Sequence, residues 1–121
     1  GLVIEAGFDS LLDPTKLVVQ FDDGIGDADS CRFDVRWYQT GYYNFHHIDE
    51  QDVNFRFDYH PKPEAPNKHF HNPPDAPSEH PQRSCITVTE PRQVTRAVHL
   101  LWRRAYEENS LTQLNEADNP P

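Results

Sequence analysis

Histidine, arginine and aspartate side chains recur at every second position in the middle of the chain. Arg56, Asp58 and His60 alternate with aromatic residues. An imidazole can move a proton near neutral pH, a carboxylate can orient that imidazole, and a guanidinium can hold developing negative charge, so this set suits general acid–base chemistry on a phosphodiester. The candidate catalytic residues are His46, Arg56, Asp58, His60 and Arg36, and the candidate binding residues are His69, His71, Tyr38 and Asn44.

Three strands are expected to position these side chains. Apolar and polar residues alternate strictly over 33–38 and 53–60, which predicts two strands that each have one buried face. Residues 42–48 predict a third strand between them. A slip of one residue would turn its apolar side chains to solvent, so the apolar face determines the register. The expected pairs are 43–59, 45–57 and 47–55 across a loop at 50–52, and 37–45 and 35–47 across a loop at 40–42.

The other face of these strands then carries the polar residues together. The register places His46 opposite Arg56 and Asn44 opposite Asp58, where Cβ atoms stand about 4.5–5.5 Å apart. Arg36 is expected on the neighbouring strand beside them. An alternative interpretation stays open, because exposed strand faces are polar in any case and such pairs are often only solvated neighbours.

The remaining periodic segments complete the predicted fold. Residues 16–21 and 85–89 predict strands, and residues 2–12 a short helix or an edge strand. A helix is expected from Pro91, capped by Thr89 or Glu90. Its apolar stripe consists of Val94, Ala97, Val98, Leu101, Trp102 and Ala105. The predicted fold class is α+β, an antiparallel sheet of about four to five strands with the C-terminal helix packed on one face.

Residues 61–81 are rich in proline and histidine. Seven prolines and the absence of Ile, Leu and Val exclude a helix and predict a loop that lies on the sheet or projects as an arm. We therefore expect one domain over 1–108 that includes this loop, followed by a flexible tail over 109–121.

A metal site is a competing interpretation of this loop. His69 and His71 lie on one side of an extended chain, and His60, Asp58 or His80 could supply a third ligand. The further residues of a known metal-binding pattern are missing, so the sequence predicts no cofactor.

Composition limits the class of protein. Apolar runs such as 17–19 and 100–102 are far shorter than the roughly 20 residues of a membrane span, which excludes a membrane protein. The expected location is the cytoplasm. The net charge of −9 disfavours a broad nucleic-acid-binding face, although a local basic pocket is compatible with it. Abundant acid with only three lysines also favours a salt-adapted protein.

Several short motifs resemble small prokaryotic toxins of the TumE type. The strand Phe55-Arg56-Phe57-Asp58, the segment from Pro66 to His71, the stretch Ile86-Thr87-Val88 and the helix from Pro91 follow one another as in that family. The resemblance covers roughly residues 31–108. It implies a toxin that a partner antitoxin neutralises and that acts on translation or RNA, with functional positions Arg56, Asp58, His69 and His71.

The sequence is compatible with three alternative functions of the protein. The first is a toxin-like ribonuclease without an obligatory metal. The second is a non-enzymatic module that docks a protein through 61–81 in extended form. The third is a metal-dependent enzyme that uses His69 and His71. The cognate antitoxin and RNA are the expected partners, and a homodimer is compatible with the sequence.

Overall fold

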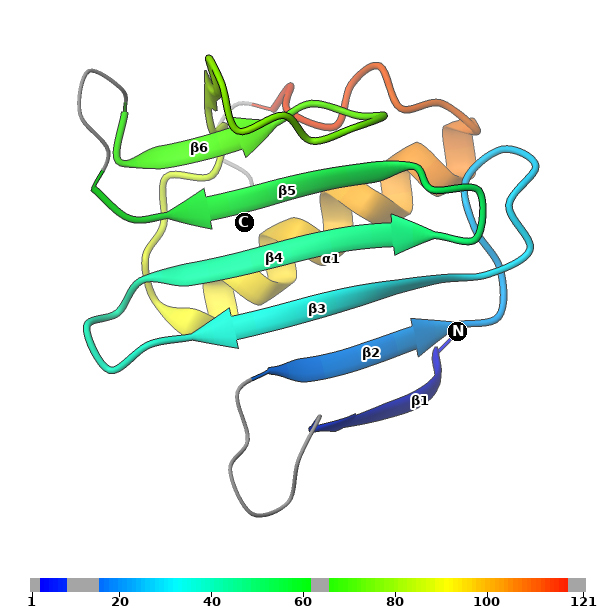
Figure 1. The fold of residues 1–121 in the computed structure, drawn as a ribbon, viewed down its shortest axis with the longest axis horizontal. Coiled ribbons are helices and arrows are strands. Elements are labelled where there is room, and N and C mark those ends of the chain that lie inside the picture. Colours follow the sequence, from blue (N-terminus) through cyan, green and yellow to red (C-terminus); the bar gives the residue numbers. More distant parts are fainter. Residues whose placement is uncertain (1–2, 9–15, 62–65, 118–121) are drawn as a thin grey trace.

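The computed structural model describes residues 3–8, 16–61 and 66–117, and within these ranges the chain forms one antiparallel sheet and one helix (Figure 1). The elements are β1 (Val3–Phe8), β2 (Leu17–Phe21), β3 (Cys31–Trp37), β4 (Tyr43–Asp49), β5 (Asn54–Tyr59), β6 (Lys68–His71), β7 (Gln82–Arg83) and α1 (Pro91–Glu108). Each strand pairs with the next in the chain. The α+β class is confirmed, but the described sheet has seven strands instead of four to five.

The register between β4 and β5 is the predicted one. Tyr43 pairs with Tyr59 and Phe45 with Phe57, so these rings share one face. On the other face, His46 lies opposite Arg56 and Asn44 opposite Asp58. The loop at 50–52 is also confirmed, closed by a 3.2 Å hydrogen bond from the Asp49 N–H to the Val53 carbonyl.

The register between β3 and β4 differs from the prediction by two residues. Val35 pairs with Phe45 and Trp37 with Tyr43, so the predicted pairing of Val35 with His47 and of Trp37 with Phe45 is wrong. A shift of two residues keeps every side chain on its predicted face, because side chains alternate with a period of two. Face patterning alone therefore could not distinguish these two registers.

The turn after β3 explains this shift. The Tyr38 N–H donates to the Tyr42 carbonyl at 3.0 Å and closes a loop over residues 39–41. Gly41 has a φ of +91°, a conformation that a residue with a Cβ rarely adopts. The loop is thus one residue earlier than the predicted 40–42, with glycine at its last position.

The proline- and histidine-rich segment is part of the sheet. Residues 68–71 form β6, which pairs with β5 and turns Phe70 into the core with an exposed fraction of 2%. The prediction of a loop over the whole of 61–81 is therefore wrong, and the last strand, β7, lies at 82–83. The predicted strand at 85–89 does not form, although Ile86 is fully buried.

The helix follows its predicted limits and covers one face of the sheet. The Glu90 carboxylate accepts hydrogen bonds from the N–H groups of Arg92 and Gln93, and Pro91 occupies the first turn. All six residues of the predicted stripe are buried. In Figure 1, α1 crosses behind β3, β4 and β5, and the aromatic face of these strands packs against it. No helix of the described residues covers the opposite face of the sheet.

The N-terminal segment forms one of the two elements predicted for it, an edge strand. Residues 3–8 form β1, an edge strand paired with β2, and not a helix. The rest of that predicted element, 9–12, lies outside the described residues.

No helix in the described ranges is both long and apolar enough to span a bilayer.

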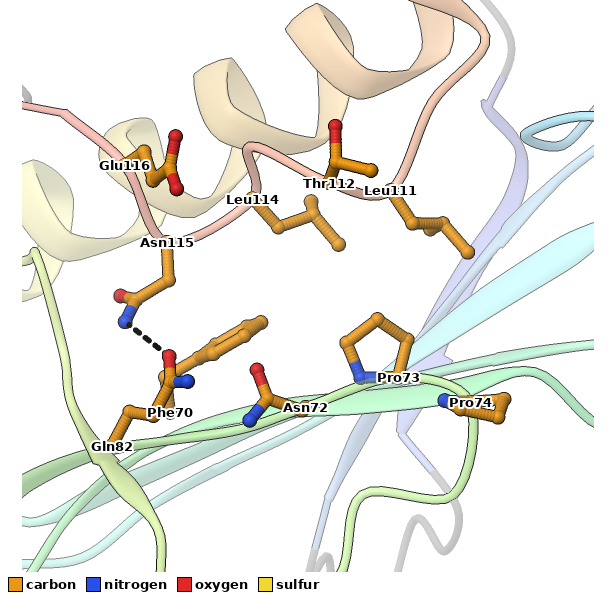
Figure 2. A pocket seen from close by; sticks show the side chains of 10 residues that line it. All are labelled: Phe70, Asn72, Pro73, Pro74, Gln82, Leu111, Thr112, Leu114, Asn115 and Glu116. Atoms are coloured by element: carbon orange, nitrogen blue, oxygen red, sulfur yellow. Dashed lines mark hydrogen bonds between the residues drawn. The ribbon is translucent and has the colours of Figure 1, made fainter.

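The chain after α1 is held against the sheet end as far as residue 117. Leu114 is 1% exposed, and the Asn115 side chain accepts a 2.7 Å hydrogen bond from the Cys85 N–H. Figure 2 shows this segment across a pocket of about 480 Å³ from Phe70 and Pro73. Residues 109–117 show no apolar periodicity. Leu114 alone was therefore not a sufficient signal in the sequence to predict these contacts. The remainder of the expected tail, 118–121, lies outside the described residues.

Candidate active site

The face of the sheet that α1 leaves bare contains a buried carboxylate. Asp58, on β5, is 1% exposed. Its Oδ1 accepts a hydrogen bond of 2.6 Å from the Asn44 amide, and its Oδ2 accepts one of 2.9 Å from Arg56 Nε. A buried charge requires such partners, because its desolvation is costly. The guanidinium supplies the balancing positive charge.

Three imidazoles lie beside this carboxylate. His71 Nε2 is 3.1 Å and His60 Nε2 is 3.7 Å from Asp58 Oδ2. The ring centroids of His60 and His69 are 4.8 Å apart. Both His69 and His71 are buried, with exposed fractions of 0% and 2%, whereas the His60 side chain is 46% exposed. His60 is therefore the imidazole of the three that a ligand in solvent can reach.

Strand pairing explains why the histidines of β6 reach the same face. His69 pairs with Asp58 and His71 with Arg56. Residues that face one another across a ladder point to the same side of the sheet. The spacing of two between His69 and His71 places both on that side, and Phe70 between them enters the core.

Backbone carbonyls orient two of these rings. His71 Nδ1 is 2.8 Å from the Pro77 carbonyl and His60 Nδ1 is 3.1 Å from the Pro61 carbonyl. A carbonyl oxygen only accepts, so Nδ1 carries the hydrogen in both rings. Nε2 of each ring then faces Asp58, and in His71 it also lies 3.2 Å from Arg56 Nη2, which can donate to it.

An open pocket of about 510 Å³ lies over this cluster. Asp58, Arg56 and His60 contribute to its lining. Tyr38 and Tyr42, from the end of β3 and the following turn, form another part of the wall. A buried charged pair, an accessible imidazole and aromatic walls thus converge on one cavity, a combination typical of ligand sites.

His46 lies on the same face but outside the pocket lining. Its Nε2 is 2.8 Å from Asn54 Oδ1, whose amide nitrogen is held by the Asp52 carbonyl at 2.9 Å. His46 Nε2 is therefore the donor, and Nδ1 carries the lone pair. Burial, with a smaller effect of Arg56, lowers the pKa of His46, so this imidazole is neutral at pH 7.

Arg36 and Tyr38 are separated from the centre of the cluster. Arg36 lies opposite Asn44 on β3, and the structure gives it no hydrogen bond or ion pair to the described cluster residues. Tyr38 is 54% exposed at the rim. The predicted set is thus brought together at Asn44, Arg56, Asp58, His60, His69 and His71, with His46, Arg36 and Tyr38 around it.

Asp34 is a buried residue of this face that the sequence reasoning did not single out. It is 4% exposed, pairs with His46 across β3 and β4, and lies 3.1 Å from Arg32 Nε and 3.6 Å from Lys16 Nζ. Asp34 lies between the apolar residues Phe33 and Val35, so the alternation of the strand already places it on the polar face. The predicted pairing of β3 with β4, which is wrong by two residues, does not place Asp34 opposite His46.

The cluster also contains a set of potential metal ligands. One ligand atom each of Asp58, His60 and His69 lies within 4.8 Å of the other two. His80, which was a candidate third ligand, is exposed and is not in this group.

The comparisons with known proteins give one result. A family model described as toxin TumE matches residues 2–109, which include all described strands and the whole of α1. Neither the curated proteins nor the solved structures give a match.

Proposed function

This chain belongs to the TumE toxin family, and from that premise we propose that it is the toxin of a toxin–antitoxin pair and cleaves RNA in the pocket over Asp58. The expected partner is a cognate antitoxin protein, and the expected place of action is the cytoplasm. One observation carries the proposal: an arginine and three imidazoles converge on a buried carboxylate next to an open pocket.

The proposed reaction is attack of a ribose hydroxyl on the adjacent phosphorus, with loss of the next nucleotide's 5′-oxygen. A base must take the proton of the attacking hydroxyl, and an acid must protonate the leaving oxygen. His60 is the proposed acid, because its side chain is 46% exposed and its Nε2 lies 3.7 Å from Asp58 Oδ2, so an accessible imidazole is held beside the pocket where it can donate a proton. The proposed base is His46, which is neutral at pH 7 and lies outside the pocket lining but opposite Arg56, a residue of that lining.

Arg56 is proposed to stabilise the negative charge that develops on the phosphate oxygens. It lines the pocket, and its side chain is 23% exposed, so it can contact a ligand while it stays paired with Asp58. Guanidinium groups suit this task because they offer several donors in one plane.

Residues at the rim are proposed to bind the flanking nucleotides. Tyr38 is exposed beside the pocket and offers a ring on which a base can stack. Arg36, farther along β3, offers a positive charge to a neighbouring phosphate. Such local contacts fit a chain with a net charge of −9, which has no need of a broad basic surface to hold a short stretch of RNA.

The structure weakens the case for a projecting docking arm. Part of the proline- and histidine-rich segment is β6, which packs Phe70 into the core. Deleting 61–81 would therefore damage the fold, so a loss of partner binding in that deletion would not identify a docking arm.

Induced expression of the chain without a neighbouring gene tests the proposal. Wild-type protein is expected to arrest growth and to fragment cellular RNA, and His60→Gln is expected to relieve both. Asp34→Asn, a change on the same face outside the pocket, is the control and should remain toxic. Unchanged growth and intact RNA with wild-type protein present at a normal level would overturn the proposal.

A further inference from the structure

Asp58, His60 and His69 combine two imidazoles and one carboxylate. Their ligand atoms lie within 4.8 Å of one another. Two nitrogen ligands and one oxygen ligand suit Zn²⁺ and the neighbouring divalent transition metals better than Mg²⁺ or Ca²⁺, which prefer oxygen. Three protein ligands beside an open pocket also leave room for further ligands from solvent.

We propose that Asp58, His60 and His69 bind a divalent transition-metal ion such as Zn²⁺, and that the bound ion prevents proton transfer by His60. The first part concerns binding alone. The second part rests on the proposed function, because it requires that His60 act as an acid in RNA cleavage.

The ligand atoms lie within 4.8 Å of one another and must approach further to bind one ion. With metal–ligand bonds of about 2.1 Å, tetrahedral ligand atoms stand about 3.4 Å apart. His60 Nε2 and Asp58 Oδ2 are already 3.7 Å apart. Asp58 and His69 are fixed as paired neighbours on β5 and β6, whereas His60 lies just after β5 with its side chain half-exposed. Movement of His60 can therefore shorten its distances to the two other ligands.

Outer partners already orient two of the ligands. A metal-binding histidine usually donates its other ring N–H to a carbonyl or carboxylate. His60 does so through Nδ1 to the Pro61 carbonyl, which turns the Nε2 lone pair toward Asp58. The Asn44 amide holds Oδ1 of Asp58 at 2.6 Å and leaves Oδ2 on the side of the imidazoles.

Arg56 opposes the ion. Its Nε is 2.9 Å from the same Asp58 oxygen, so a bound cation must share that oxygen with a guanidinium. We therefore expect reversible binding, with the metal and Arg56 competing for Asp58 Oδ2. A coordinated nitrogen has no lone pair left for a proton, which is why the ion should inhibit cleavage.

Metal binding is measured first on the full chain, purified without a histidine tag. Zn²⁺ is titrated by calorimetry, and Co²⁺ by its visible absorption, which reports nitrogen and oxygen ligands directly. Wild-type protein is expected to bind a single ion per chain. His60→Gln is expected to weaken binding by at least about tenfold. His46→Gln, which removes an imidazole of the same face outside the ligand set, should bind like wild type.

The binding result decides the first part of the proposal. Substoichiometric binding by wild-type protein, or equal loss in His60→Gln and His46→Gln, would overturn the site. Because His60 is half-exposed, its replacement is expected to leave the fold intact, and circular dichroism of each variant checks this. A loss of binding in a folded His60→Gln protein supports the site.

A cleavage assay then separates the two proposals. Inhibition by Zn²⁺ that EDTA reverses supports the inhibitory role. Loss of cleavage in EDTA with recovery on adding Zn²⁺ supports the site but overturns the inhibition. Stoichiometric binding by a protein that never cleaves RNA overturns the proposed function and leaves the metal site standing.

Discussion

Two aspartates are buried on the same face of the sheet, and their surroundings differ. Asp34 on β3 is 4% exposed and Asp58 on β5 is 1% exposed. The partners of Asp34 are the more exposed Arg32 and Lys16, with side chains 45% and 27% exposed. Those of Asp58 include an amide, a guanidinium and imidazoles beside a pocket.

The difference shows that burial of a charge does not by itself identify a functional site. Asp34 has partly solvated ion-pair partners, Arg32 on its own strand and Lys16 just before β2, as the alternative interpretation of the polar face described. Asp58 has partners that can exchange protons or bind an ion. The proposed chemistry therefore lies at the Asp58 end of the face. The following changes test whether the Asp34 and Asp58 ends differ as described.

The largest difference in stability is expected between Asp58→Asn and Asp34→Asn. The first change removes the counter-charge of Arg56 at a buried position and should lower the free energy of unfolding by about 2–3 kcal/mol. The second affects pairs with exposed partners and should cost less than about 1 kcal/mol. Urea unfolding of both variants measures this, and equal losses would remove the distinction between the two aspartates.

His60→Gln separates catalysis from stability at the Asp58 end. Loss of a general acid is expected to slow RNA cleavage by about 100-fold or more. The free energy of unfolding should change by no more than about 0.5 kcal/mol, because the side chain is half-exposed. A rate within about threefold of wild type would remove His60 from the reaction.

His47 tests what burial does to a group without a charged partner. It is fully buried on the helix face and stacks on Phe55 with ring centroids 4.4 Å apart. Burial lowers its pKa from 6.5 to about 3. Between these values the unfolded chain binds a proton and the folded chain does not, so stability is lost as the pH falls from about 6.5 toward 3.

The expected slope from His47 is up to about 1.4 kcal/mol per pH unit. Urea unfolding of wild type and His47→Leu at a series of pH values measures its contribution, and the variant should show the shallower loss. Parallel curves for the two proteins would show that His47 does not contribute to acid sensitivity.

The smallest effect is expected at Arg36, which lies on β3 opposite Asn44. It makes no described ion pair with the cluster, and its proposed contact is with a flanking phosphate. Arg36→Ala should raise the KM for RNA about three- to tenfold and leave kcat almost unchanged. A fall in kcat equal to that of His60→Gln would move the reaction centre toward β3.

The sequence predicts the faces of the central strands because a slip by one residue would expose the aromatic side chains. It does not distinguish registers that differ by two residues. Between β3 and β4, the turn that contains Gly41 determines the register. β6 has a single apolar member, Phe70, between prolines, so its pairing with β5 could not be derived from periodicity. His69 and His71 were selected as candidates, but only that pairing brings them to Asp58.

The most direct test of the account compares purified Asp58→Asn and Asp34→Asn in cleavage of a fluorescently labelled RNA, each at a temperature where circular dichroism shows it folded. We expect Asp58→Asn to lose cleavage and Asp34→Asn to retain the wild-type rate within about twofold. Cleavage at the wild-type rate by a folded Asp58→Asn protein would contradict the central claim that the pocket beside Asp58 is where the toxin acts.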